Sequence, residues 1–160
     1  MNKNRTMIVA AGLLALAAVA GAAGNASAAT HDTNIPGGDY LEARLQTQGG
    51  WSGVGTSCIT VQSDVILYGN NPFYAQSIKN ETTLDAYGFQ PTLSWRGITR
   101  RGGNVSVSLT DSYTNGYDWR STMGGAACIN VTTPYITGVT KGSAYVPSQG
   151  GWYYSNAGMN

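Results

Sequence analysis

Residues 57–62 read Ser-Cys-Ile-Thr-Val-Gln, and residues 127–132 read Ala-Cys-Ile-Asn-Val-Thr. Both stretches surround a cysteine with β-branched residues, which is the composition of a β-strand. Cys58 and Cys128 are the only cysteines in the sequence, and both follow an export signal. We therefore predict a disulfide between Cys58 and Cys128 that joins two strands of one exported domain.

The export signal occupies residues 1–29. Lys3 and Arg5 give a basic start, residues 7–19 are apolar or small, and Ala-Ser-Ala at residues 26–28 forms a cleavage pattern. The apolar run is shorter than the roughly 20 residues that a spanning helix needs. We expect cleavage after Ala28 or Ala29, no membrane insertion of the mature chain, and one secreted, extracellular domain at residues 30–160. The alanine-rich signal is typical of bacteria.

The charge balance of the mature chain is close to neutral. The full sequence has nine Lys and Arg against eight Asp and Glu. Removal of Lys3 and Arg5 with the signal leaves seven basic residues against eight acidic ones. Nucleic acids and anionic membranes attract basic proteins, so neither is an expected partner.

The fold class follows from alternation. Leu41, Ala43 and Leu45 alternate with polar residues, which predicts a strand with one buried and one wet face. No stretch of about a dozen residues keeps the apolar spacing of a helix, and turn signals recur every 8 to 12 residues or so. We predict an all-β domain, either a small antiparallel β-sandwich or a Greek-key barrel with one disulfide. Further strands are expected at residues 59–68, 93–95, 105–110, 127–133, 136–139, 144–146 and 152–154.

Two hairpins are predicted. Asn115-Gly116 follows the strand at residues 105–110 and is the strongest short-range signal for a two-residue hairpin loop. The register of that hairpin sets Asp111 opposite Arg120 as a cross-strand ion pair. A second hairpin turn is expected at residues 100–103.

Catalytic residue types are scarce. The only histidine, His31, lies near the expected mature N-terminus, where chains are usually mobile, so a histidine-based active site has little support. Zinc ligands are missing or bridged, and no calcium-loop motif occurs, so no metal and no cofactor is expected. Paired carboxylates remain open as a hydrolase site. The acidic candidates are Asp64, Glu81, Asp85, Asp111 and Asp118.

Aromatic residues give the best functional hint. Tyr113, Tyr117 and Trp119 crowd one predicted hairpin, and Trp152 lies in a second aromatic cluster near the C-terminus. Exposed rings of this kind stack on sugars or anchor protein interfaces, whereas buried rings fill a core. The exposure of the four tryptophans separates these two roles. They are Trp51, Trp95, Trp119 and Trp152.

Three function hypotheses result. The first is a secreted, non-catalytic binding protein that presents Tyr113, Tyr117, Trp119 and Trp152 to an extracellular protein or polysaccharide. The second is a small carboxylate-dependent extracellular hydrolase. The third is a surface or structural protein, or a secreted antagonistic protein, whose low charge and Gly and Tyr content suit self-association.

Overall fold

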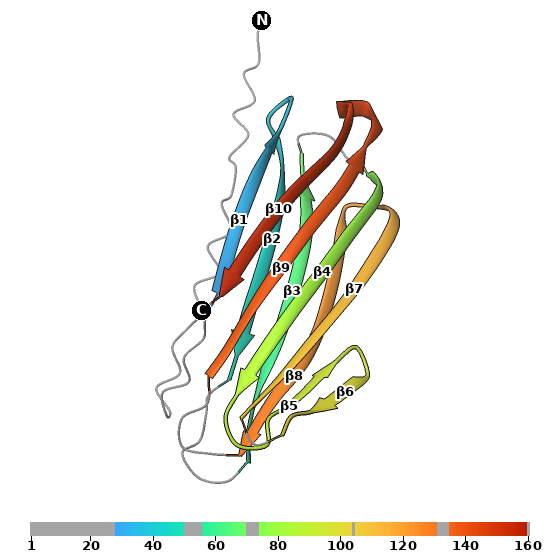
Figure 1. Cartoon of the computed structure of the whole chain (residues 1–160). Coiled ribbons are helices and arrows are strands. Elements are labelled where there is room, and N and C mark those ends of the chain that lie inside the picture. Colours follow the sequence, from blue (N-terminus) through green and yellow to red (C-terminus); the bar gives the residue numbers. More distant parts are fainter. Residues whose placement is uncertain (1–27, 50–55, 70–73, 104, 131–134, 160) are drawn as a thin grey trace, which may run out of the picture.

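Two antiparallel sheets make up the computed structural model, which describes residues 28–49, 56–69, 74–103, 105–130 and 135–159 (Figure 1). The six-stranded sheet has the order β1-β2-β3-β8-β5-β6 and the four-stranded sheet the order β10-β9-β4-β7. The strands of the first are β1 (Ala28–Ile35), β2 (Asp39–Gln48), β3 (Thr56–Tyr68), β8 (Arg120–Asn130), β5 (Thr92–Trp95) and β6 (Ile98–Arg101). Those of the second are β10 (Gly151–Met159), β9 (Tyr135–Val146), β4 (Ala75–Tyr87) and β7 (Ser106–Asp118). A short 3-10 helix, η1 (Pro147–Gln149), joins β9 to β10.

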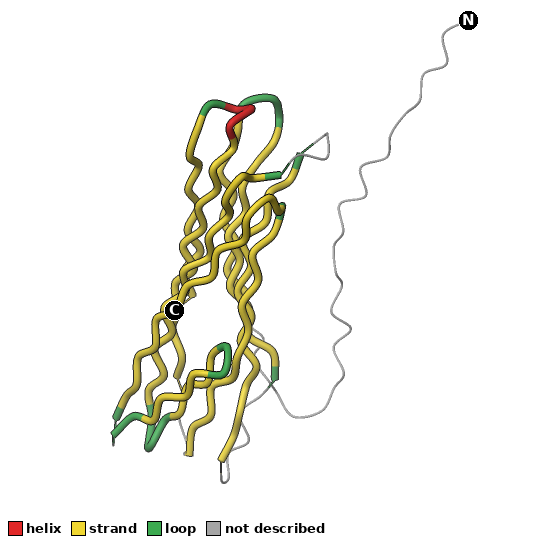
Figure 2. The backbone as a smooth tube through the Cα atoms, turned by 90° about the vertical axis from the view of Figure 1, so that its right-hand side faces the viewer, coloured by secondary structure: helices red, strands yellow, loops and turns green. Residues whose placement is uncertain are grey.

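The two sheets form the layers of a sandwich whose strands run along its long axis (Figures 1 and 2). At one edge, β1 lies beside β10, and the Ser155 hydroxyl donates a hydrogen bond of 2.7 Å to the His31 carbonyl. The predicted all-β class is therefore confirmed, and the sandwich is the alternative that the chain adopts. β1 precedes the strand expected around Leu41, and His31 belongs to β1 rather than to a free end.

The core has two apolar clusters with a buried polar layer between them. Along β3, Val61 belongs to one cluster and Val65 to the other, while Ser63 lies between them. The Ser63 hydroxyl donates to Asn80 Oδ1 at 2.9 Å, and the Thr82 hydroxyl donates to Ser63 Oγ at 2.7 Å. Each of these polar side chains is buried and hydrogen-bonded, which avoids the cost of unpaired polar groups inside the sandwich.

The predicted disulfide is confirmed. Cys58 on β3 and Cys128 on β8 are direct cross-strand partners with a Cα–Cα distance of 4.1 Å. The bridge spans 70 positions of sequence yet joins neighbouring strands. The first cysteine stretch lies wholly in β3, whereas residues 131 and 132 of the second lie outside the described residues.

The hairpin predicted at Asn115-Gly116 is wrong. β7 runs through both residues to Asp118 and pairs with β4, so that Gly116 lies opposite Ser77. The next strand, β8, belongs to the other sheet. The local turn preference of Asn-Gly yields to pairing with the 13 residues of β4, because a long ladder satisfies more backbone groups than a two-residue turn does.

Three further predictions also need correction. The Asp111–Arg120 pair does not form, because Arg120 binds Asp64 and Asp111 lies 3.5 Å from Arg96. The second hairpin turns at Arg96 and Gly97, which have φ values of 46° and 82°, and residues 100–101 lie within β6. The separate strands expected at residues 136–139 and 144–146 are parts of one strand, β9.

Candidate functional site

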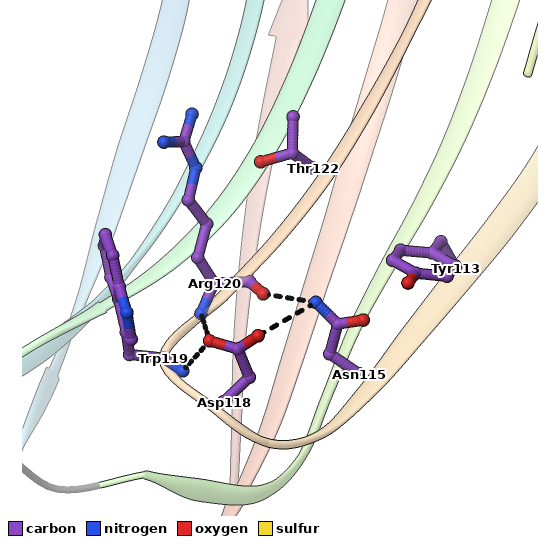
Figure 3. A pocket seen from close by; sticks show the side chains of 6 residues that line it. All are labelled: Tyr113, Asn115, Asp118, Trp119, Arg120 and Thr122. Atoms are coloured by element: carbon purple, nitrogen blue, oxygen red, sulfur yellow. Dashed lines mark hydrogen bonds between the residues drawn. The ribbon is translucent and has the colours of Figure 1, made fainter.

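An open pocket of about 420 Å³ lies where the chain crosses from the four-stranded to the six-stranded sheet (Figure 3). Figure 3 shows Trp119 on one side of the Asp118–Asn115 pair and Tyr113 on the other. The pocket volume lies within the range of small-ligand sites. The residues that line the pocket are Tyr113, Asn115, Asp118, Trp119, Arg120 and Thr122.

Asp118 builds the crossover turn. Its Oδ1 accepts hydrogen bonds from the backbone N–H of Trp119 at 2.7 Å and of Arg120 at 3.3 Å. Its Oδ2 accepts from Asn115 Nδ2 at 3.3 Å, and the same amide donates to the Arg120 carbonyl at 2.7 Å. Tyr117 adopts the left-handed φ of 55° just before the turn. These bonds fix the backbone that carries Trp119, as aspartate side chains commonly do in turns.

Asp64, a buried residue of β3, binds the Arg120 side chain. Asp64 Oδ1 accepts from Arg120 Nε at 3.1 Å and Nη2 at 2.7 Å, and from the Thr122 hydroxyl at 2.6 Å. Asp64 Oδ2 accepts from Gln62 Nε2 at 2.8 Å. The Asp64 carboxylate is nearly inaccessible, whereas 38% of the Arg120 side chain remains exposed. Arg120 therefore lines the pocket with a side chain that is anchored by Asp64 and still partly exposed.

Tyr113 is fixed by a residue from a distant turn. The Arg96 guanidinium lies 4.3 Å from the centre of the Tyr113 ring, a cation–π contact. Arg96 Nη1 also donates to the Ser112 carbonyl at 3.0 Å, which closes part of the open edge of β7. The pocket therefore has a restrained aromatic wall rather than a freely rotating one.

Three of the four predicted binding residues lie at this crossover. Tyr113 and Trp119 line the pocket, and Tyr117 lies between them in sequence with 75% of its surface exposed. Trp119 is 46% exposed, whereas Trp95 is 1% exposed and belongs to the core. Trp51 lies outside the described residues.

Trp152, the fourth predicted residue, is not part of the pocket. It lies on β10 at the outer face of the four-stranded sheet and is 50% exposed. It shares a cross-strand rung with Tyr145, Ser77 and Gly116, so it lies at the same end of the sheet as the crossover turn.

The carboxylates named for a hydrolase are divided among three strands. Asp64 is buried on β3, Glu81 pairs with Lys79 on β4, and Asp111 contacts Arg96 from β7. Asp85 lies on β4, and Asp118 is the only one of the five that lines the pocket. Its oxygens are occupied by the turn.

Glu42 is an acidic residue that sequence reasoning missed. Alternation along β2 placed it on the wet face, but it is 7% exposed and paired with Arg44. Burial raises the pKa of the Glu42 carboxyl; Arg44 opposes the shift, and Asp32 and Asp64 add to it. Alternation along a strand shows which residues share a face, but it does not show which residues on the outer face are buried by neighbouring side chains.

No known protein-family model matches the chain, and comparison with curated proteins finds no similar sequence. Within the described residues, no helix has the length and apolar character needed to cross a membrane. Among the same residues, no three His, Cys, Asp or Glu side chains gather as metal ligands.

Proposed function

We propose that this chain is a secreted, non-catalytic extracellular binding protein whose crossover pocket recognises a protein partner. The observation that carries this function is the half-exposed Trp119 beside an anchored Arg120 and a restrained Tyr113. Tryptophan, tyrosine and arginine dominate the energetic centres of protein interfaces. Their fixed positions reduce the entropy that a partner would otherwise lose on binding.

The disulfide supports a location outside the cytosol, because such bonds persist in oxidising compartments. The basic start and the cleavage pattern at residues 1–29 also support secretion. Bacterial origin rests on the composition of that segment.

Site-specific photocrosslinking in the secreting cell tests the pocket. A benzophenone amino acid replaces Tyr117, which is exposed and borders the pocket, and in a matched control it replaces Thr99 on β6. We expect a discrete protein adduct from position 117 alone. Addition of Trp119→Ala should reduce that adduct about tenfold, since loss of a central interface tryptophan costs 2 kcal/mol or more.

Equal adducts from positions 117 and 99 would overturn the proposal, and so would an adduct that survives Trp119→Ala. An adduct with polysaccharide in place of protein would assign the pocket to a glycan instead. Trp119 is exposed, so its loss should leave folding intact, which a thermal unfolding curve checks.

A carboxylate-dependent extracellular hydrolase is a second candidate, favoured by the raised pKa of Glu42. A general acid needs a pKa near the working pH, and a second carboxylate, that of Asp64, lies two cross-strand pairs away on the neighbouring strand. Glu42→Gln should abolish hydrolysis of a panel of fluorogenic β-glycosides if this candidate holds. Equal rates in the wild type and Glu42→Gln, or no hydrolysis by either, exclude Glu42 as that acid.

A further inference from the structure

The outer face of β10 carries an aromatic strip at one end of the four-stranded sheet. Side chains alternate along the strand, so Trp152 and Tyr154 share the outer face while Tyr153 packs against the core. The Tyr153 hydroxyl donates to the Gln149 carbonyl at 2.6 Å, which ties that inner ring to η1. Trp152 and Tyr154 are 50% and 63% exposed.

The exposed rings form one continuous surface. The planes of Trp152 and Tyr154 differ by only 20°, and their centres lie 6.4 Å apart. Tyr145, opposite Trp152 on β9, adds a third ring at 5.3 Å. Trp152 and Tyr154 are thus two stacked, exposed rings, and exposed aromatic rings offer apolar faces against which the flat side of a sugar can pack.

Polar groups and a positive charge continue this surface along the same two strands. Ser143 lies opposite Tyr154, and the next cross-strand pair on the same outer face is Asn156 with Lys141. Lys79 on β4 binds the Glu81 carboxylate at 2.8 Å. Lys141 is exposed and lies opposite Glu81, whose carboxylate it stabilises electrostatically. Lys79 and Lys141 together outnumber this one carboxylate, so the group keeps a net positive charge that a ligand can meet.

From this arrangement we propose that Trp152, Tyr154 and Lys141 bind a carboxylate-bearing chain of β-linked pyranose sugars. The flat apolar faces of the sugars lie on the two rings, and a carboxylate of the chain pairs with the Lys141 ammonium. Asn156 and Ser143 offer amide and hydroxyl groups to the sugar hydroxyls between these contacts.

The surroundings of the rings favour a glycan over a protein at this face. The core of a protein interface is a continuous apolar patch, depleted of lysine and serine. Here the neighbours of the rings are Ser143, Asn156 and Lys141. Ser77 on β4 is the cross-strand partner of Tyr145. Hydroxyl and amide neighbours, with two lysines (Lys79 and Lys141) against the one carboxylate of Glu81, match an anionic sugar chain.

The site shares no residue with the crossover pocket, so the two can be tested apart. Calorimetric titration of the full mature chain uses three probes: hyaluronan octasaccharide, peptidoglycan glycan strands freed of peptide, and neutral chitooctaose. We expect one or both anionic probes to bind more tightly than chitooctaose at low salt, and this preference to shrink at high salt. The probe that binds more tightly identifies uronic-acid chains or cell-wall strands as the source.

Variants locate the binding. Trp152→Ala and Tyr154→Ala should each weaken binding of the anionic probe about tenfold. Lys141→Gln should weaken it about threefold and remove its salt dependence, while Lys141→Arg should retain it. Trp119→Ala, the matched control at the pocket, should bind the octasaccharide as the wild type does. All four positions are exposed, and unchanged thermal unfolding confirms intact folding.

Three results would each overturn this assignment: no binding of either anionic probe, equal binding of chitooctaose, or wild-type affinity in Trp152→Ala. Loss of octasaccharide binding in Trp119→Ala alone would also overturn it and would make the pocket the glycan site. Failure of the crosslinking experiment leaves these outcomes unaffected, because that experiment reports on the pocket only.

Discussion

Glu42 illustrates how one buried acid sets a pH dependence. The folded protein penalises its ionised form through burial, so its pKa lies above the ordinary value of 4.5. The folded state then retains the Glu42 proton at pH values where the unfolded chain has lost it. Stability from this residue is therefore greatest in acid and declines as the pH rises from about 4.5 through the raised pKa.

Glu42→Gln should remove that decline. The melting temperature of the variant, relative to wild type, should rise between about pH 4 and pH 7, since the neutral amide has no ionised form to penalise. Glu81→Gln is the matched control with the opposite sign. Lys79 lowers the pKa of Glu81, so the stability from Glu81 is present above 4.5 and is lost as the pH falls. A difference for Glu42→Gln that stays constant with pH would contradict the assignment.

Substitution of two glycines tests whether residues 115–116 lie in a strand or in a hairpin turn. Gly116 lies in β7, and Gly97 lies in the turn between β5 and β6. A two-residue hairpin of the Asn-Gly type needs positive φ at both residues, but Gly116 does not have a positive φ. A Cβ added at Gly116 would make only an ordinary contact, 3.8 Å from the Gln76 carbonyl oxygen. Gly116→Ala should change the free energy of unfolding by less than about 0.5 kcal/mol. Gly97→Ala, at a true turn with a φ of 82°, should cost about 1 to 2 kcal/mol. Urea unfolding compares the two, and a larger cost at Gly116 would restore the hairpin.

The disulfide joins β3 to β8 and closes a long loop. In the chain-entropy model, a bridge that spans 70 positions stabilises the folded state by about 4 kcal/mol. The Cys58→Ser, Cys128→Ser double variant should lose a comparable free energy of unfolding in urea. Wild-type protein under reducing conditions serves as its control and should unfold at the same urea concentration. An unchanged unfolding midpoint would mean that strand pairing alone holds β3 against β8.

Strand content was predictable where the pattern is local. The alternation at Leu41, Ala43 and Leu45 marks β2 correctly, because a one-sided strand repeats every two residues. The pairing of Cys58 with Cys128 followed from there being only two cysteines in a chain whose sequence predicts export. Sheet membership was not predictable, since the partner that β7 chooses depends on β4, which lies about 30 positions earlier in the sequence.

The pocket is a property of the whole molecule. Its rings come from β7 and from the crossover, its arginine is anchored by Asp64 of β3, and Arg96 of the β5–β6 turn restrains Tyr113. Sequence reasoning identified Tyr113 and Trp119 because aromatic residues cluster locally. It missed Asp64 and Arg96 as supports, because their contacts span 56 and 16 or more positions and follow from the order of strands.

The most direct test of the binding function is the affinity of the partner recovered by crosslinking at position 117. Titration of that purified protein against wild type, Trp119→Ala and Trp152→Ala compares the pocket with the outer face of β10. The dissociation constant should rise at least about tenfold for Trp119→Ala and remain unchanged for Trp152→Ala. Wild-type affinity in Trp119→Ala would contradict the assignment of the crossover pocket as the binding site.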